Sequence, residues 1–153
     1  MRVAIGADEA DPLLAVIEEE LAALGHQVTR VGARPNAPVA WGQVALDIGH
    51  LVAAGSADQG IVCCYTGTGV SMAANKVAGV RAALCVDAQT ASGARQWNDA
   101  NVLALSLRLT SPTLAREIVR AWTSTPYAGS EAASLDALRN EESRHSAATD
   151  PSR

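Results

Sequence analysis

The sequence predicts an α/β fold with a five-stranded, parallel, doubly wound (Rossmann-like) sheet, helices on both faces and an extra C-terminal helix. Two observations lead to this prediction. Short apolar segments typical of buried strands alternate with segments of helical periodicity, and the connections between them are short. The 153 residues, 48% of them hydrophobic, suffice for one domain with a substantial core. Because the chain contains no Phe, that core must consist mainly of Ala, Val, Leu and Ile.

The expected elements follow one another in the order strand, helix, strand. Strands are expected at residues 2–6, 27–31, 60–64, 80–86 and 102–106. Helices are expected at residues 12–24, 42–54, 70–76, 88–97 and 112–123, with a sixth at 130–139 outside the sheet layers. Pro12 in the first turn and Gly25 after the last turn mark the ends of the first helix. We predict one domain over residues 1–140 and a polar, disordered tail over residues 141–153.

Composition excludes several kinds of partner and site. The formal net charge of −4 gives no overall basic field, so no nucleic acid is expected as a partner. No apolar run approaches the ~20 residues needed to cross a bilayer, and the first residues do not resemble a signal peptide. We therefore expect no membrane association and a cytoplasmic location. Cys63, Cys64 and Cys85 lack the spacing of metal ligands, so reduced thiols and no metal site are expected.

The most informative stretch is residues 60–76, Gly-Ile-Val-Cys-Cys-Tyr-Thr-Gly-Thr-Gly-Val-Ser-Met-Ala-Ala-Asn-Lys. A buried-type strand leads into a Gly/Thr loop and then a helix, which directs backbone N–H groups and Cys64 at one point. Such amides favour negative charge, so the stretch could hold an anion or an oxyanion formed in a reaction, beside a stabilised thiolate. Alone, the pattern is equally consistent with a tight turn beside a buried cysteine.

Several polar residues follow the predicted strands directly. In a parallel sheet the carboxyl ends of the strands share one edge, where ligands bind. That edge is expected to carry Asp8 and Glu9 after the first strand, residues 64–69 after the third, Asp87 after the fourth and Arg108 after the fifth. The sequence therefore predicts one site at this edge.

With these positions in view, the chain resembles the sugar-phosphate isomerase family that contains ribose-5-phosphate isomerase B and galactose-6-phosphate isomerase. The resemblance runs from Val3 to a point near Trp122. Its most specific pieces are residues 66–69 (Thr-Gly-Thr-Gly), 72–76 (Met-Ala-Ala-Asn-Lys), 81–85 (Arg-Ala-Ala-Leu-Cys) and 98–105 (Asn-Asp-Ala-Asn-Val-Leu-Ala-Leu). The resemblance implies an aldose–ketose isomerase without a cofactor, which moves a proton between neighbouring carbons through an enediolate. It also implies a homodimer or homotetramer with sites at the subunit interface.

The resemblance assigns roles to individual residues. Cys64 is implied as the proton-transferring base, Thr66 as the group that handles hydroxyl protons, and Asp8 as a further catalytic residue. The remaining residues are implied as substrate-binding: Glu9, Gly67, Thr68, Gly69, Trp97, Asn98 and Arg108. Among these, the backbone amides of residues 67–69 and the Asn98 side chain are candidate donors to an oxyanion, and Arg108 is the matched phosphate ligand.

Four departures from the family pattern concern the substrate end. Glu9 stands where the family usually has His, and Trp97 replaces the histidine assigned to ring opening. Residues 41–43 read Trp-Gly-Gln instead of Tyr-Pro-Asp, and Glu131 lies where C-terminal cations normally meet the phosphate. Each lost charge-assisted hydrogen bond is worth ~1.5–3 kcal/mol, so tight binding of the usual five-carbon phosphate is not expected.

The departures rank the functions. We expect an active isomerase of a short, open-chain sugar phosphate, such as a four-carbon one, because such a substrate needs no ring opening. Ribose 5-phosphate comes second. A non-catalytic or partner-dependent subunit is the alternative from another class, and a nucleotide-binding module is the weakest interpretation. Trp97 either lines the sugar pocket or fills the space left by the histidine, and the sequence leaves both open.

Overall fold

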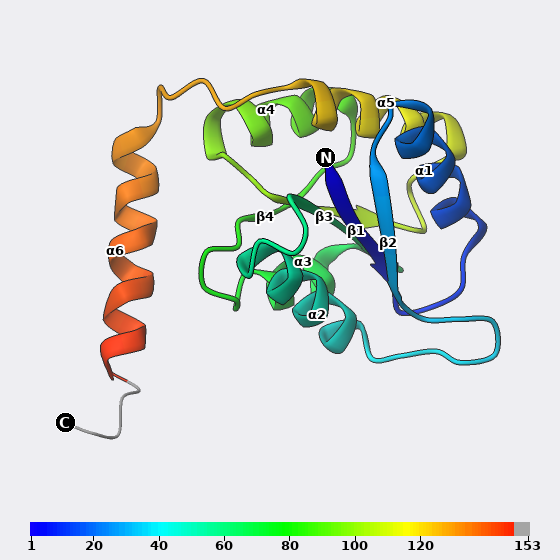
Figure 1. Ribbon diagram of the computed structural model, residues 1–153, viewed down its shortest axis with the longest axis horizontal. Helices are drawn as coiled ribbons and strands as arrows, with labels where there is room; N and C mark the ends of the chain where they lie inside the picture. The colour runs from blue at the N-terminus through cyan, green and yellow to red at the C-terminus, as the bar shows by residue number, and fades with distance from the viewer. Residues whose placement is uncertain (149–153) are drawn as a thin grey trace.

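The computed structural model describes the backbone of residues 1–148 and the side chains of residues 1–144. Its centre is a five-stranded sheet in the order β2-β1-β3-β5-β4, in which every neighbouring pair is parallel (Figure 1). The strands are β1 (Arg2–Ala7), β2 (Gln27–Gly32), β3 (Gln59–Cys64), β4 (Ala82–Leu84) and β5 (Val102–Ser106). The predicted fold class is confirmed. Residues 149–153 of the predicted tail lie outside the described residues.

Helices cover both faces of the sheet (Figure 1). One face packs against α1 (Pro12–Ala23), α4 (Ala88–Asn98) and α5 (Pro112–Ser124). The other packs against α2 (Trp41–Ala53) and the short α3 (Thr68–Ala74). A sixth helix, α6 (Ala132–Ala148), lies beside these layers. The helices that follow β1, β4 and β5 therefore share one face, and those that follow β2 and β3 share the other.

Side-chain caps fix where several helices begin. The Asp11 carboxylate accepts a hydrogen bond from the Leu13 N–H at 2.8 Å, and Pro12 occupies the first turn of α1. Asp87 and Thr90 form a reciprocal capping box at the start of α4. These caps satisfy amides that have no partner within the helix, which is why strand-to-helix turns occur at these residues.

The alternation of side chains along β3 and β5 divides the core in two. On the α1–α4–α5 side the sheet contributes larger residues, among them Ile5, Ile61, Leu103 and Leu105. On the α2–α3 side it contributes Ala4, Val62, Cys64 and Ala104. Consecutive strand residues point to opposite faces, so Cys63 belongs to the first core and Cys64 to the second.

Strand β4 is shorter than the predicted strand at residues 80–86. Only Ala82–Leu84 form the ladder with β5, and the amides at the two ends of the predicted strand have other partners. The Val80 N–H donates to the Val77 carbonyl, and the Val86 N–H donates to Thr90 Oγ1. On the outer side, the Asn75 side chain accepts from the Ala82 N–H and donates to the Ala82 carbonyl, both at 2.8 Å. An apolar run alone did not reveal these competing hydrogen bonds.

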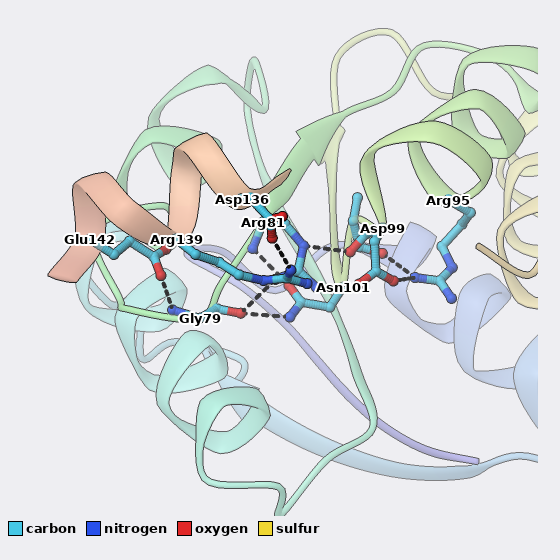
Figure 2. A network of polar contacts seen from close by, with 9 residues as sticks. Gly79, Arg81, Arg95, Asp99, Asn101, Asp136, Arg139 and Glu142 are labelled. Atoms are coloured by element: carbon cyan, nitrogen blue, oxygen red, sulfur yellow. Dashed lines mark hydrogen bonds and ion pairs between the residues drawn. The ribbon is translucent and has the colours of Figure 1, made fainter. Parts of the chain in front are cut away.

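Helix α6 stands away from the main body, next to the loop between α3 and β4 (Figure 1). It extends beyond the predicted 130–139 because the following residues include Glu, Arg and Ala, which favour helix. Leu135 of α6 is buried. The Glu142 carboxylate accepts a hydrogen bond from the Gly79 N–H at 3.2 Å (Figure 2). A groove of about 760 Å³ lies between α6 and residues 75–83.

The loop that meets α6 is itself tied to the turn between α4 and β5 (Figure 2). The Arg81 guanidinium donates to the Asp99 carboxylate at 2.8 Å, and the Asn101 side chain donates to the Gly79 carbonyl at 2.9 Å. These bonds fix the entry to β4 and, with it, the surface that α6 faces. Within residues 1–148, no helix is both long and apolar enough to cross a membrane.

Candidate active site

The carboxyl ends of the strands bring the predicted site residues that follow β1, β3 and β5 to one edge of the sheet. Cys64 is the last residue of β3 and pairs with Ser106, the last residue of β5. Ala7 pairs with Cys63 across the β1–β3 ladder, so Asp8 follows at the level of Cys64. The order β1-β3-β5 places the first, third and fifth strand ends side by side.

The two adjacent cysteines have different surroundings. Cys63 is completely buried, and burial raises the pKa of its thiol, with smaller contributions from Cys64, Asp11 and Asp8. Cys64 is 5% exposed, and its Sγ accepts a hydrogen bond from the Gly67 N–H at 3.2 Å. The backbone of the Gly/Thr loop therefore directs one N–H donor at the sulfur of Cys64.

Two glycines allow close contacts around the loop. At Gly67, where φ is +77°, an added Cβ would lie 2.5 Å from Leu84 Cδ1 and 2.9 Å from the Leu105 carbonyl carbon. At Gly69 it would lie 3.0 Å from Trp41 Cε3. The loop therefore contacts Leu84 at Gly67 and Trp41 at Gly69: a Cβ at Gly67 would overlap its neighbours, and a Cβ at Gly69 would press on the Trp41 ring.

The polar groups of the loop divide into engaged and outward-facing ones. The Gly67 N–H is bound to the Cys64 sulfur. The amides of Thr68 and Gly69 are in the first turn of α3, where helix geometry supplies no acceptor. The hydroxyls of Thr66 and Thr68, both on exposed residues, lie 2.7 Å apart. Of the three amides proposed from the sequence, those of Thr68 and Gly69 thus face outward while that of Gly67 serves the thiol.

The exit of β5 is held against the exit of β3 by a set of short bonds. The Leu107 N–H donates to the Cys64 carbonyl at 3.0 Å, and the Arg108 N–H donates to the Tyr65 carbonyl at 3.1 Å. Ser106 Oγ donates to the same Tyr65 carbonyl at 2.9 Å. Arg108 is thereby anchored next to the Cys64 loop, with its side chain exposed.

Asp8 and Glu9 form an acidic end of the site. The Asp8 carboxyl is partly buried, and loss of hydration raises its pKa, as does the charge of Glu9. The Asp8 carbonyl accepts from the Val39 N–H at 3.0 Å, which holds the proline-containing loop of residues 33–40 against this end. Glu9 is exposed. This end of the site suits hydroxyl groups better than a phosphate.

Trp97 and Asn98 lie at the last turn of α4, in a separate hollow of about 410 Å³ beside β4. The Trp97 ring packs against Gly93 of its own helix and is half exposed. Leu84 lines this hollow and also contacts the Cys64 loop, so it lies between the two. Among the hydrogen bonds of the described side chains, none joins Trp97 or Asn98 to that loop within one chain. Asp87 caps α4 and faces Thr90.

The C-terminal cations have partners on their own helix. Arg139 pairs with Asp136 at 2.9 Å and Arg144 with Glu141 at 3.2 Å, whereas Glu131 is exposed just before α6. Across the described part of the chain, no cluster of three or more His, Cys, Asp or Glu side chains could hold a metal ion.

Comparison with known proteins identifies the family. The family model described as ribose/galactose isomerase matches residues 3–138. The chain belongs to this family. It is 39% identical over 132 residues to D-erythrulose-4-phosphate isomerase of Pectobacterium atrosepticum, covering 84% of this chain and 86% of that protein. It is 37% identical over 129 residues to ribose-5-phosphate isomerase B of Escherichia coli, covering 84% and 87%.

The fold agrees with that assignment. The structure of ribose-5-phosphate isomerase B from Clostridium thermocellum superimposes with a TM-score of 0.90 at 35% identity, covering 95% of this chain and 99% of that one. The chain is thus a sugar-phosphate isomerase of the ribose/galactose isomerase family, an enzyme class that shifts hydrogen within one molecule. The resemblance predicted from residues 66–69 and the other sequence blocks is confirmed.

Two residues that contact the Cys64 loop were not among the predicted site residues. Trp41 is the first residue of α2, and its ring lies on Gly69. The sequence offered a signal, since Trp41 stands in place of the family's usual tyrosine. Leu84 gave no signal beyond its place at the end of a strand, because the contact with Gly67 depends on how β4 packs beside the loop.

Proposed function

We propose that this isomerase interconverts an aldose phosphate and a ketose phosphate, with the Cys64 thiolate transferring a proton between neighbouring carbons. The observation that supports the proposal best is the bond from the Gly67 N–H to Cys64 Sγ, at the point where β3 meets the Gly/Thr loop. It distinguishes Cys64 from the fully buried Cys63. General-base catalysis of this kind contributes typically ~10²–10⁴-fold to the rate.

The proposed reaction has two proton transfers. The Cys64 thiolate removes a proton from the carbon next to the carbonyl, and the electron pair of that C–H bond forms the C=C bond of an enediolate. The oxyanion that develops on the carbonyl oxygen accepts hydrogen bonds from the outward-facing amides of Thr68 and Gly69. The Thr66 hydroxyl moves a proton between the two oxygens. The Cys64 thiol then returns its proton to the other carbon, and the thiolate is restored.

The charges at the two ends of the site determine the orientation in which the substrate binds. Arg108 lies at one end of the site and the Asp8–Glu9 pair at the other. A phosphate dianion is attracted by the guanidinium and repelled by the two carboxylates, so we place the phosphate at Arg108 and the hydroxyl-bearing end at Asp8 and Glu9.

We further propose a short, open-chain substrate. Trp97 cannot act as the acid or base that opens a sugar ring, because an indole only donates a hydrogen bond. A four-carbon sugar phosphate avoids this step. The 39% identity to a relative named D-erythrulose-4-phosphate isomerase supports this substrate class, since erythrulose is a four-carbon ketose.

An assay of substrates by length tests the proposal. Aldoses of four, five and six carbons, with and without phosphate, are incubated with the enzyme, and ketose formation is measured. We expect the four-carbon phosphate to give the highest kcat/KM. If ribose 5-phosphate is preferred by a wide margin, the substrate assignment fails and the isomerase mechanism stands. Absence of turnover with all of them would favour the non-catalytic or partner-dependent subunit instead.

We also propose that the enzyme is a homodimer or homotetramer with sites at the subunit interface. Exposed apolar side chains surround the β4 edge of the sheet, and they come from several elements: Met72, Leu84, Val86, Trp97 and Leu138. A second copy covering this edge would shield them, and it would bring a further surface to the neighbouring Cys64 loop. Sedimentation equilibrium tests this proposal, and a monomer at micromolar concentration would contradict it.

A further inference from the structure

We propose that Trp41 forms one wall of the substrate site and limits the length of the sugar phosphate that reaches Cys64. The inference rests on the proposed isomerase function and adds a residue that determines its specificity. It is supported by the packing of the Trp41 ring on Gly69, by the exposure of the ring and by the chemistry of an indole.

The Trp41 ring lies directly on the loop. Three ring carbons, Cε3, Cδ2 and Cζ3, lie 3.0, 3.1 and 3.3 Å from the point where a Cβ on Gly69 would be. This contact fixes the ring relative to the Gly69 backbone. At the same time the side chain remains 49% exposed, so a large part of the ring faces solvent beside the loop.

The approach to the thiol is narrow. Cys64 is only 5% exposed, and the loop that covers it is bordered by Leu84 at Gly67 and by Trp41 at Gly69. The Gly67 N–H bond to Cys64 Sγ holds this loop beside the thiol, so a substrate at the thiol also lies beside the loop. The side chain at residue 41 therefore sets one boundary of the space in which the rest of the substrate lies.

An indole suits this role chemically. Its flat apolar face packs against the C–H groups of a sugar chain, and Nε1–H can donate one hydrogen bond to a hydroxyl or phosphate oxygen. Trp is larger than the tyrosine that the family usually has here. Because the ring rests on the Gly69 backbone, moving aside for a longer substrate would break this packing contact. A wall of this kind favours a short chain.

Trp41→Ala and Trp41→Tyr test the proposal, with Leu24→Ala as the matched control. Leu24 is a comparably exposed apolar residue, 41%, at the far end of α1. We expect the ratio of kcat/KM for five-carbon over four-carbon aldose phosphate to rise at least about tenfold in Trp41→Ala, and less in Trp41→Tyr. The ratio should stay constant in Leu24→Ala. An unchanged ratio in both Trp41 variants would overturn the proposal.

A second readout is independent of turnover. The rate of Cys64 alkylation is measured with small iodoacetamide and with a bulky maleimide, and labelled peptides are identified by mass spectrometry. If Trp41 borders the path, Trp41→Ala raises the bulky-to-small rate ratio at least about tenfold, while Cys63 stays unlabelled. An unchanged bulky-to-small ratio in Trp41→Ala would overturn the proposal that Trp41 borders the path, even if the enzyme is active.

The two readouts separate the two hypotheses. If the wild-type chain turns over no sugar phosphate and the alkylation ratio still rises in Trp41→Ala, the proposed function fails and the wall stands. Labelling of Cys63 in Trp41→Ala would indicate that this variant is unfolded, and the test then depends on Trp41→Tyr. A rise in its bulky-to-small alkylation ratio at Cys64, smaller than the roughly tenfold rise expected for Trp41→Ala, supports the proposal. An unchanged ratio contradicts it.

Discussion

Cys63 and Cys64 are neighbours on one strand, yet they belong to different parts of the molecule. Cys63 lies in the core beneath α1, α4 and α5, where burial keeps its thiol protonated. Cys64 lies on the other face, at the start of the Gly/Thr loop, with a backbone N–H on its sulfur. One step along the strand thus separates a thiol beneath α1, α4 and α5 from a thiol beside the Gly/Thr loop, because side chains alternate between faces.

Replacing the two cysteines in turn gives the largest expected effect. Cys64→Ala should lower kcat by ~10²–10⁴-fold, because the proposed base is lost. Cys63→Ala should retain most of the activity, since its side chain faces the opposite core. Steady-state kinetics with the best substrate measures both, and proton exchange from solvent into substrate provides a direct readout. Full exchange in Cys64→Ala together with its loss in Cys63→Ala would reverse the assignment.

Alkylation sharpens the comparison without a substrate. Iodoacetamide at pH 7–8 should modify Cys64 well before Cys63 or Cys85, because burial raises the pKa of Cys63 and raises that of Cys85 to about 11. The expected preference is at least about tenfold, since only the thiolate reacts. Sugar phosphate should slow the reaction at Cys64. Equal labelling of all three cysteines, insensitive to substrate, would remove the distinction.

A third expected effect is on the free energy of unfolding at alkaline pH. The folded-state pKa of both Cys63 and Cys85 lies above the unfolded value of about 8.5. The contribution of the two thiols to the free energy of unfolding is therefore complete below about pH 8.5. It falls as the pH rises towards their pKa values in the folded protein, by about 1.4 kcal/mol per pH unit for each thiol. Urea unfolding between pH 8 and 10.5 measures the slope. The Cys63→Ala/Cys85→Ala double variant should show a shallower slope, and an identical slope would show that the two thiols do not contribute.

The sequence predicted most of the fold and the position of the Gly/Thr loop. The structure explains why the remaining predictions failed. Residues 102–106 were predicted as a strand with the observed bounds, because a short apolar run bounded by polar residues has few alternatives. Residues 80–86 did not behave in the same way, since the Val80 N–H donates to the Val77 carbonyl and the Val86 N–H donates to Thr90 Oγ1. Such side-chain competition depends on three-dimensional neighbours and leaves little trace in local composition.

The same limit applies to the site. The thiol, the glycines and the acidic pair could be placed from strand ends, because parallel strands bring their carboxyl ends together. Which ring borders the loop could not. Trp97 and Trp41 are both half-exposed aromatic residues, but only Trp41 packs on Gly69 in the described chain. Their difference comes from helix packing. Helix α2, which carries Trp41, packs directly beside α3, whereas α4, which carries Trp97, lies on the opposite face of the sheet.

The Asn75 side chain has a consequence for how this protein avoids aggregation. An edge strand normally offers rows of unpaired amides and carbonyls, to which a foreign strand can add. At Ala82 both groups are already bound to one amide side chain, in the way that a neighbouring strand would bind them. With only three residues in β4, what remains is too short for a new ladder. Any chain that docks at the β4 edge must therefore do so through side chains, and the sheet cannot grow at this edge by continuous strand addition.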